Sequence, residues 1–393
     1  MLVIGGGIHG VGVAQAAAAA GHSVLLVEKT RLAAGTSSRS SKLIHGGLRY
    51  LEGFHFGVVR ECLRERRILL RIAGDLVRMD TFHLPVYAGG RRPPWLIGSG
   101  LGLYALLAGF APGSGFSRLG TREIDALPGL RREGLRTVFR FQDGRTDDRL
   151  LTCAVMHSAI ALGARLWQPA ECLGAELNEE GAVARIRRGS REQEVLCRVL
   201  VNAAGPWVGE MTARIRPRPP ETPFELIQGS HVVIQQAVVD RCYYMENPRD
   251  GRGVFMLPWE GSTLVGTTET RFQGPPDRVA PRPAEIRYLK KALRHFFPDC
   301  RKALQGPVAA FAGLRVLPSG SGHAFQRSRE TRLVADRDVN PRLISIYGGK
   351  LTAYRATAQK VLARAAAGLP RRQPAADTAI LPLKPAPEVL PSG

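Results

Sequence analysis

The 393-residue sequence predicts an α/β fold, and two observations support this prediction. The first residues read as a short apolar strand, a glycine-rich turn, an Ala-rich helix and a second apolar strand. Further along, residues typical of strands dominate a long region, 225–268, before a helical pattern returns at 283–297. The length is sufficient for two domains with a substantial core.

The N-terminal unit contains three glycines spaced G-x-G-x-x-G directly after the first strand, Gly5, Gly7 and Gly10. The first glycine permits a tight turn, the second allows the backbone to approach a pyrophosphate, and the third allows close packing of helix on strand. The following helix then offers free N–H groups to the phosphates. This pattern predicts a Rossmann-type dinucleotide site.

An acidic residue in the expected place strengthens this prediction. Glu28 ends the second strand, Ser23–Val27, and lies 18 residues beyond Gly10. A carboxylate there can accept hydrogen bonds from both ribose hydroxyls and would repel a 2′-phosphate, which disfavours NADP. The motif alone does not distinguish NAD from FAD.

The rest of the chain predicts a mixture of helices and strands, without internal repeats. We expect helices at 57–72, 148–162, 283–297 and 351–367, and strands at 164–166, 200–203 and 343–347. A hairpin is expected from 183–187 to 195–197, across Gly189-Ser190. The Pro-rich tail, 371–393, predicts a loosely packed or disordered extension.

The net charge of +21 is unusual for a globular protein. It indicates either a basic surface that attracts anions, such as phosphorylated substrates or acidic lipids, or an Arg-rich solvated surface without a special role. We expect no nucleic-acid binding, because no motif for it is present. The six cysteines form no CxxC pair, so no metal site is predicted, and without a signal peptide they fit a reducing cytoplasm.

One uncharged apolar segment, Trp95–Phe110, is too short to span a membrane and is interrupted by glycines. It is either a core helix or a segment that dips into one leaflet of a membrane. Arg91 and Arg92 precede it, and basic residues beside apolar ones suit an anionic interface.

Several longer motifs carry a family resemblance. Thr36–Glu52 reads TSSRSSKLIHGGLRYLE, and together with the N-terminal glycines it closely resembles the FAD-dependent, respiratory (quinone-linked) glycerol-3-phosphate dehydrogenases. That family lies within the amine- and hydroxy-acid-oxidising flavoproteins. Further matches occur in the family's order up to about residue 360: Val201–Val208, Gln228–Ile234, Pro258-Trp259, Gly266–Glu269, Gly313–Leu317 and Gly348–Arg355.

The resemblance implies a Rossmann-type FAD-binding domain interleaved with a substrate domain built on a large antiparallel sheet. We expect the FAD domain to comprise residues 1–75, 145–215 and 305–370, and the substrate domain residues 76–144 and 216–304. Relatives usually continue into a helical C-terminal domain. This chain ends after its Pro-rich tail, so we expect that domain to be absent.

The resemblance also implies a reaction. The enzyme would oxidise sn-glycerol 3-phosphate to dihydroxyacetone phosphate by hydride transfer to flavin N5, and the electrons would pass to quinone. A cytoplasmic protein, peripheral on the inner face of the cytoplasmic membrane through contact with anionic lipids, would fit this role, and a homodimer is possible.

The resemblance assigns FAD-binding residues from several parts of the chain. Besides the glycines of the turn and Glu28, they are Ser37, Ser38, Ser41, Lys42, Gly46, Gly47, Gly205, Gly348, Gly349, Lys350, Leu351 and Thr352. The pair Gly348-Gly349 is expected just before a helix, whose dipole would stabilise an anionic reduced flavin.

Substrate residues follow from the same resemblance. Arg49, Arg315 and Lys350 match the pocket cations, and Tyr50 and His231 match their polar neighbours. Arginine suits a dianionic phosphate because its planar fork pairs with two oxygens. We expect His231 to be the base that takes the hydroxyl proton, and Arg315 or Lys350 to polarise the forming carbonyl.

Three alternatives stay open. The chain could be a related FAD-dependent oxidase or dehydrogenase of another hydroxy acid or amine, or a catalytically silent FAD-binding relative. A nicotinamide-dependent enzyme is a further alternative. Glu269 stands where the family usually has Asp, a change that lengthens the side chain by one methylene.

Overall fold

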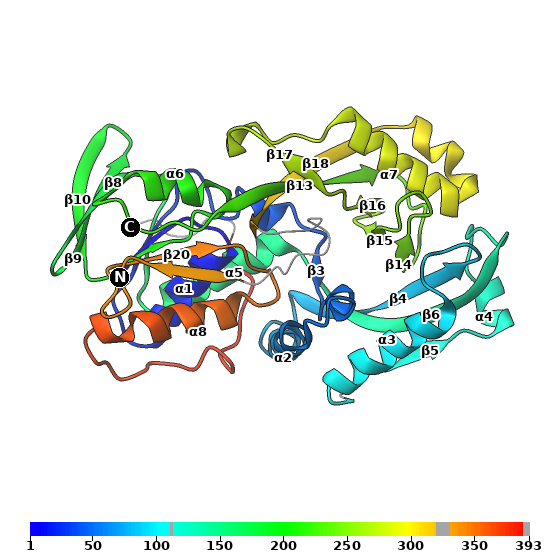
Figure 1. Ribbon diagram of the computed structural model, residues 1–393, viewed down its shortest axis with the longest axis horizontal. Coiled ribbons are helices and arrows are strands. Elements are labelled where there is room, and N and C mark those ends of the chain that lie inside the picture. Colours follow the sequence, from blue (N-terminus) through cyan, green and yellow to red (C-terminus); the bar gives the residue numbers. More distant parts are fainter. Residues whose placement is uncertain (111–112, 320–330, 388–393) are drawn as a thin grey trace.

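The computed structural model describes residues 1–110, 113–319 and 331–387. It contains two large sheets that lie side by side along the longest axis of the molecule (Figure 1). One is mainly parallel and carries the N-terminal turn, and the other is mainly antiparallel. The predicted class, a Rossmann-type unit combined with a large antiparallel sheet, is confirmed.

The parallel sheet is built from five short strands drawn from distant parts of the chain. In order across the sheet they are β20 (Leu343–Tyr347), β11 (Leu200–Asn202), β1 (Leu2–Ile4), β2 (Leu25–Val27) and β7 (Arg165–Trp167). A sixth strand, β19 (Arg332–Ala335), pairs antiparallel with β20 at the edge. The central strands are buried on both faces, which explains their continuous apolar runs.

Different layers cover the two faces of this sheet. Helices α1 (Ile8–Ala19), α5 (Asp148–Ala161) and α8 (Tyr354–Ala365) pack together on one face. The small sheet formed by β8 (Glu171–Asn178), β9 (Gly181–Arg188), β10 (Arg191–Cys197) and β12 (Ile215–Arg216) covers the other. All five alanines of α1 are buried, so this helix can approach its neighbours closely.

The second sheet has ten strands, eight in its main path and two, β5 and β18, paired beside it. Its members are β3 (Leu43–Ile44), β4 (Val77–Tyr87), β5 (Phe116–Arg118), β6 (Leu135–Thr146), β13 (Phe224–Ile234), β14 (Cys242–Glu246), β15 (Gly253–Trp259), β16 (Ser262–Gly266), β17 (Thr270–Phe272) and β18 (Val308–Pro318). All pairings are antiparallel except that of β14 with β4. β18 pairs with β13 along its whole length.

The remaining helices cover the second sheet and the junction between the two sheets. Helix α7 (Pro283–Phe296) packs on one face through Leu289, Leu293 and Phe296. Helix α3 (Pro94–Leu107) packs on the opposite face near β6. Helix α2 (Phe56–Ile72) lies at the junction, and α4 (Thr121–Asp125) and α6 (Val208–Ala213) are short.

One expectation needs correction, and two others gain detail. The last helix begins at Tyr354, not at residue 351, because Lys350–Ala353 forms a turn closed by the Ala353 N–H bond to the Lys350 carbonyl, 3.2 Å. Most of residues 371–387 are exposed, as expected of a loose extension, but the tail is anchored at Leu383, which is buried and whose N–H donates to the Ile72 carbonyl. Residues 388–393 lie outside the described part of the chain. The apolar segment is a helix with both a buried and an exposed face.

Candidate active site

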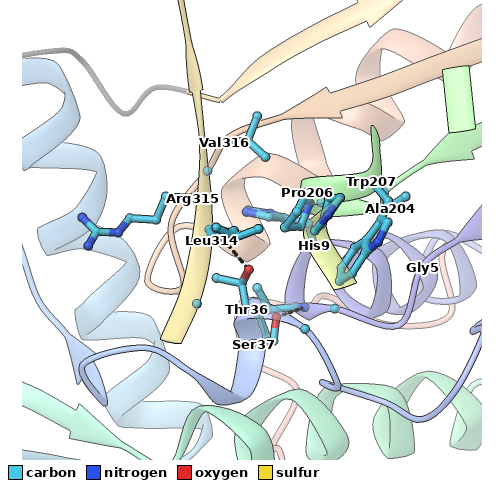
Figure 2. A pocket seen from close by; sticks show the side chains of 18 of the residues that line it. Gly5, His9, Thr36, Ser37, Ala204, Pro206, Trp207, Leu314, Arg315 and Val316 are labelled. Carbon is cyan, nitrogen blue, oxygen red and sulfur yellow. Dashed lines mark hydrogen bonds between the residues drawn. The ribbon is translucent and has the colours of Figure 1, made fainter. Parts of the chain in front are cut away.

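A single cavity of about 550 Å³ extends from the glycine-rich turn to the strands of the second sheet. Its walls come from the carboxyl ends of the parallel strands, from the 3-10 segment η1 (Thr36–Ser38), and from β13 and β18. Ligands of open α/β sheets bind at such strand ends. Figure 2 shows the middle of this cavity, where Thr36 reaches β18 through a 2.6 Å hydrogen bond from its hydroxyl to the Leu314 carbonyl.

The glycines of the turn lie where a side chain would clash. Gly5 has φ +108°, and a Cβ placed on it would lie 2.6 Å from the Ala203 carbonyl oxygen. A Cβ on Gly10 would lie 1.9 Å from the Gly5 oxygen, so Gly10 allows α1 to pack on β1. Gly5 and Gly7 line the cavity, whereas Gly10 has this packing role behind it.

Glu28 lies at the end of β2 and lines the cavity, as the sequence predicted. One of its carboxylate oxygens accepts the Gly6 N–H at 2.7 Å, and the other accepts the Thr30 N–H at 2.8 Å. These bonds fix the carboxylate beside the turn, where a ribose would lie in a dinucleotide site.

The serine-rich segment divides between the cavity and the structure behind it. Ser37 accepts the Ile8 N–H at 2.9 Å, which places its hydroxyl at the N-terminus of α1. Ser37 and Ser41 line the cavity. Ser38 is outside its lining, and its hydroxyl donates to the Gly35 carbonyl at 3.4 Å.

Three further predicted residues support the cavity wall from behind. Lys42 is buried and donates to Asp148 at the start of α5, a 2.5 Å ion pair. A Cβ on Gly46 would lie 2.2 Å from the Tyr104 hydroxyl, and Gly47 has φ +80° beside the Tyr50 ring. None of the three lines the cavity, so their predicted contact with a cofactor stays a prediction.

The loop after β20 closes one side of the cavity, and its residues 348–352 all line it. Gly349 has φ +112°, and a Cβ there would lie 2.1 Å from His9 Nε2. The Thr352 hydroxyl donates to the His45 carbonyl at 3.3 Å. Gly205, which follows β11 and has φ +56°, lines the same space.

His231 lies on β13 at the second-sheet end of the cavity and is only 3% exposed. Its Nε2 lies 2.9 Å from the Ser41 hydroxyl, and its ring stacks on Phe311 with centroids 4.9 Å apart. Burial lowers the pKa of His231 to about 3, with smaller contributions from the positive charges of Arg315 and Lys42. The imidazole is therefore neutral at physiological pH.

Two arginines converge on one carboxylate beside His231. Arg315 on β18 donates to Glu269 at 2.7 Å, and Arg49 Nη2 lies 3.6 Å from the same oxygen. Lys350 lies on the opposite loop with its Nζ 4.5 Å from the centroid of the Tyr50 ring. Tyr50, Arg315 and Lys350 line the cavity, and Arg49 reaches this group through Glu269.

The sequence interpretation did not single out several residues that line this cavity. They include Arg39, Trp207, Thr267 and Leu314. Arg39 lies within the serine-rich motif, between Ser38 and Ser41, so its position in that motif was an available signal. Leu314 lies on β18, a strand that the sequence analysis did not recognise.

The residues present fit an adenine dinucleotide that carries a redox ring. The backbone of the turn is free of side chains, Glu28 is fixed beside it, and cations and a neutral imidazole lie at the other end of the same cavity. Such volumes are typical of cofactor sites, which measure about 300–1,000 Å³.

Comparison with known proteins gives the family. Residues 1–355 match the model of the family described as FAD dependent oxidoreductase. The chain belongs to this FAD-dependent oxidoreductase family. Its cofactor is therefore FAD, which selects FAD over the nicotinamide alternative.

Individual relatives within this family have named activities. The chain is 36% identical over 373 residues to a glycerol-3-phosphate dehydrogenase of Pseudomonas aeruginosa, covering 92% of this chain and 70% of the relative. It is 33% identical over 369 residues to a D-erythritol 1-phosphate dehydrogenase of Brucella abortus, covering 93% and 73% of the two chains.

A solved structure with a similar fold is also a glycerol-3-phosphate dehydrogenase. The glycerol-3-phosphate dehydrogenase of Bacillus halodurans, complexed with FAD, superposes with a TM-score of 0.76 at 28% identity. The match covers 96% of this chain and 66% of that one, so this chain spans about two thirds of the length of the solved relative.

Proposed function

We propose that this flavoprotein oxidises sn-glycerol 3-phosphate to dihydroxyacetone phosphate. The observation that carries the proposal is the convergence of Arg315, Lys350 and a neutral His231 at one end of the FAD cavity, with Arg49 joined to Arg315 through Glu269. The relatives named glycerol-3-phosphate dehydrogenase support it.

Phosphate recognition is the proposed task of the cations. Arg49, Arg315 and Lys350 outnumber the single carboxylate of Glu269 in this group. A phosphate monoester carries a charge of about −1.5 to −2 near neutral pH, so a pocket with excess positive charge stabilises it. Glu269 orients Arg315 before the substrate arrives, which reduces the entropy lost on binding.

His231 is the proposed base. A neutral imidazole has a lone pair for the hydroxyl proton, and the Ser41 hydroxyl orients the ring. Arg315 and Lys42 oppose a positive charge on His231. The phosphate of a bound substrate would counter those charges, so we propose that proton transfer becomes favourable only in the complex. Bound FAD supplies the two-electron acceptor in this reaction.

We propose quinone as the final acceptor and peripheral contact with an anionic cytoplasmic membrane as the setting. The net charge of +21 and the exposed apolar side chains Trp95, Leu96 and Leu106 on α3 favour this setting. Among the described residues, no helix is both long and apolar enough to cross a membrane. A homodimer stays a prediction.

The first test is anaerobic addition of sn-glycerol 3-phosphate to the FAD-loaded protein. We expect loss of the oxidised flavin absorbance band, because hydride transfer reduces the ring. An unchanged band in protein shown to be folded and FAD-bound would contradict the proposed substrate.

A second candidate substrate is a longer polyol phosphate. The relative named D-erythritol 1-phosphate dehydrogenase is almost as similar to this chain as the Pseudomonas one, and it favours this candidate. Comparing the rates of flavin bleaching by D-erythritol 1-phosphate and by sn-glycerol 3-phosphate decides between them.

Substitution of Arg315 separates phosphorylated from unphosphorylated substrates. We expect Arg315→Leu to lower kcat/KM for sn-glycerol 3-phosphate by at least about tenfold, since a hydrogen bond to a charged group contributes about 1.5–3 kcal/mol. The matched Arg315→Lys variant keeps the charge and should lose less. Equal activity of Arg315→Leu and the unmodified protein would favour a hydroxy acid or an amine without phosphate.

A further inference from the structure

A second cavity, of about 880 Å³, opens in the antiparallel sheet where β4 and β14 separate. These strands pair only at Cys242 with Phe82 and at Tyr243 with His83, although β4 begins five residues earlier at Val77. We call this opening the β4–β14 notch. It shares no lining residue with the FAD cavity.

Arginines dominate the charged lining of the notch, which comprises Arg78, Arg140, Arg145 and Arg241 with Asp80 and Asp240. Both aspartates are already neutralised by neighbours. Asp80 accepts from Arg145 at 2.9 Å, and Asp240 lies 3.5 Å from Arg241. Arg140 also pairs with Glu123 outside the notch, at 3.3 Å, and the lining still keeps an excess of positive charge.

Arg145 forms a rigid floor for this opening. Its side chain is only 6% exposed, and it donates to Asp80 and, at 2.6 Å, to the Pro258 carbonyl. Its Nε has no hydrogen-bond partner among the described residues. A buried guanidinium with an unsatisfied donor is costly, and because this positive charge lines the opening, the floor favours an anionic occupant.

The rim is more accessible than the floor. The side chains of Arg78 and Arg241 are 73% and 42% exposed, so they can reorient toward a ligand. Ser117 adds a hydroxyl that already accepts from Arg140 at 3.2 Å. Planar guanidinium groups around one opening match the oxygens of a phosphate group.

We propose that the β4–β14 notch is an anion site, separate from the FAD cavity, that binds a phosphate group. Its volume exceeds what one phosphate needs, which leaves space for the molecule that carries it. Two sources share this chemistry, a free phosphate compound and the headgroup of an anionic lipid. Phe116 at the rim is 39% exposed and lies beside α3, where a Cβ on Gly102 would be 3.8 Å from its ring, so an apolar surface adjoins the notch.

The test uses the FAD-loaded full chain with two matched double variants. Arg78→Gln/Arg241→Gln removes the two exposed cations of the rim and leaves the buried floor intact. The control, Arg185→Gln/Arg191→Gln, changes the net charge equally on β9 and β10, at the opposite end of the molecule (Figure 1). Both pairs are made in an Arg315→Leu background for the phosphate titration, so that the substrate pocket contributes little binding.

Inorganic phosphate is titrated calorimetrically, and binding to phosphatidylglycerol vesicles is measured by co-sedimentation. We expect Arg78→Gln/Arg241→Gln to weaken binding of phosphate, or of the vesicles, at least about tenfold. The control should leave both unchanged. Weaker phosphate binding identifies a free phosphate compound, and a loss confined to vesicles identifies the lipid headgroup.

Unchanged binding of both probes by the notch variant would overturn the proposal. An equal loss in the control would also overturn it, because the effect would then come from the net charge alone. Flavin bleaching by sn-glycerol 3-phosphate is measured for both pairs without the Arg315 change. It should persist, so failure of the notch proposal can be told from failure of the proposed substrate.

Discussion

At the scale of single residues, the site depends on an imidazole that folding keeps neutral. His231 is 3% exposed, and burial lowers its pKa to about 3. In the unfolded chain the pKa would be about 6.5. Between these values the unfolded chain binds a proton that the folded chain does not. The contribution of His231 to stability is therefore complete above about pH 6.5 and falls as the pH drops toward 3.

This difference predicts the effect of one substitution on acid sensitivity. The free energy of unfolding should fall by up to about 1.4 kcal/mol per pH unit below pH 6.5 on account of His231. His231→Gln should remove that part of the slope, whereas His157→Gln, on the partly exposed side of α5, serves as the control. Urea unfolding between pH 7 and pH 5 measures how the free energy of unfolding changes with pH. Identical slopes for His231→Gln and the unmodified chain would contradict the prediction.

Most of the residues that the sequence predicts for the site line the cavity, but the sequence did not indicate their contacts. The glycine turn and Glu28 follow from local spacing, because one strand-turn-helix-strand unit contains them all. The Ser41–His231 and Arg315–Glu269 contacts join residues far apart in the sequence. Spacing carries no information on such contacts, since they arise only when distant segments come together around the second sheet.

At the scale of elements, the last helix is joined to α2 by a buried ion pair. Arg355 on α8 donates twice to Glu65 on α2, at 2.7 and 2.8 Å, and their side chains are 7% and 2% exposed. Both charges are removed from water, so each depends on the other. The pair fixes α8, and with it the loop 348–352 that closes the cavity.

Removing one partner of this ion pair should destabilise the protein more than replacing both partners. Glu65→Leu alone leaves a buried guanidinium without its partner and should lower the free energy of unfolding by about 3–5 kcal/mol. The double variant Glu65→Leu/Arg355→Met should recover much of that loss, because no charge stays buried. Urea unfolding of the single and double variants checks this, and equal or greater loss in the double variant would show that the pair does not act in this way.

Elements with a clear local pattern were predicted well, and those that depend on neighbours were not. The runs that became β1, β2, β11 and β20 are mainly apolar and wholly buried because both faces of their sheet are covered. Strands β6 and β18 were not recognised. β6 carries four charged residues, and Asp143 and Arg145 are buried only because Arg66 and Asp80 pair with them. Those partners come from α2 and β4, so the pattern of β6 itself does not indicate burial.

At the scale of the whole molecule, apolar and basic surfaces occur together. The exposed large apolar side chains of α3 and the turn after it are Trp95, Leu96, Leu106 and Phe110. Arg91 lies exposed before the helix, whereas Arg92 is engaged by Glu52 and Glu246. A helix that buries one face in the protein and presents apolar side chains on another can lie at a membrane interface.

This arrangement predicts selective binding to anionic membranes. We expect co-sedimentation with phosphatidylglycerol vesicles, little with phosphatidylcholine vesicles, and weakening as salt shortens the screening length from about 10 Å at 0.1 M to about 3 Å at 1 M. Trp95→Ser/Leu106→Ser should weaken vesicle binding by at least about tenfold, because each apolar side chain contributes about 1.5–3 kcal/mol when fully buried.

The control Leu196→Ser/Ile380→Ser removes similarly exposed apolar side chains from β10 and the tail. If lipid charge made no difference, or if both pairs lost binding equally, α3 would not be the docking surface, and the acceptor of the electrons would have to be sought in solution.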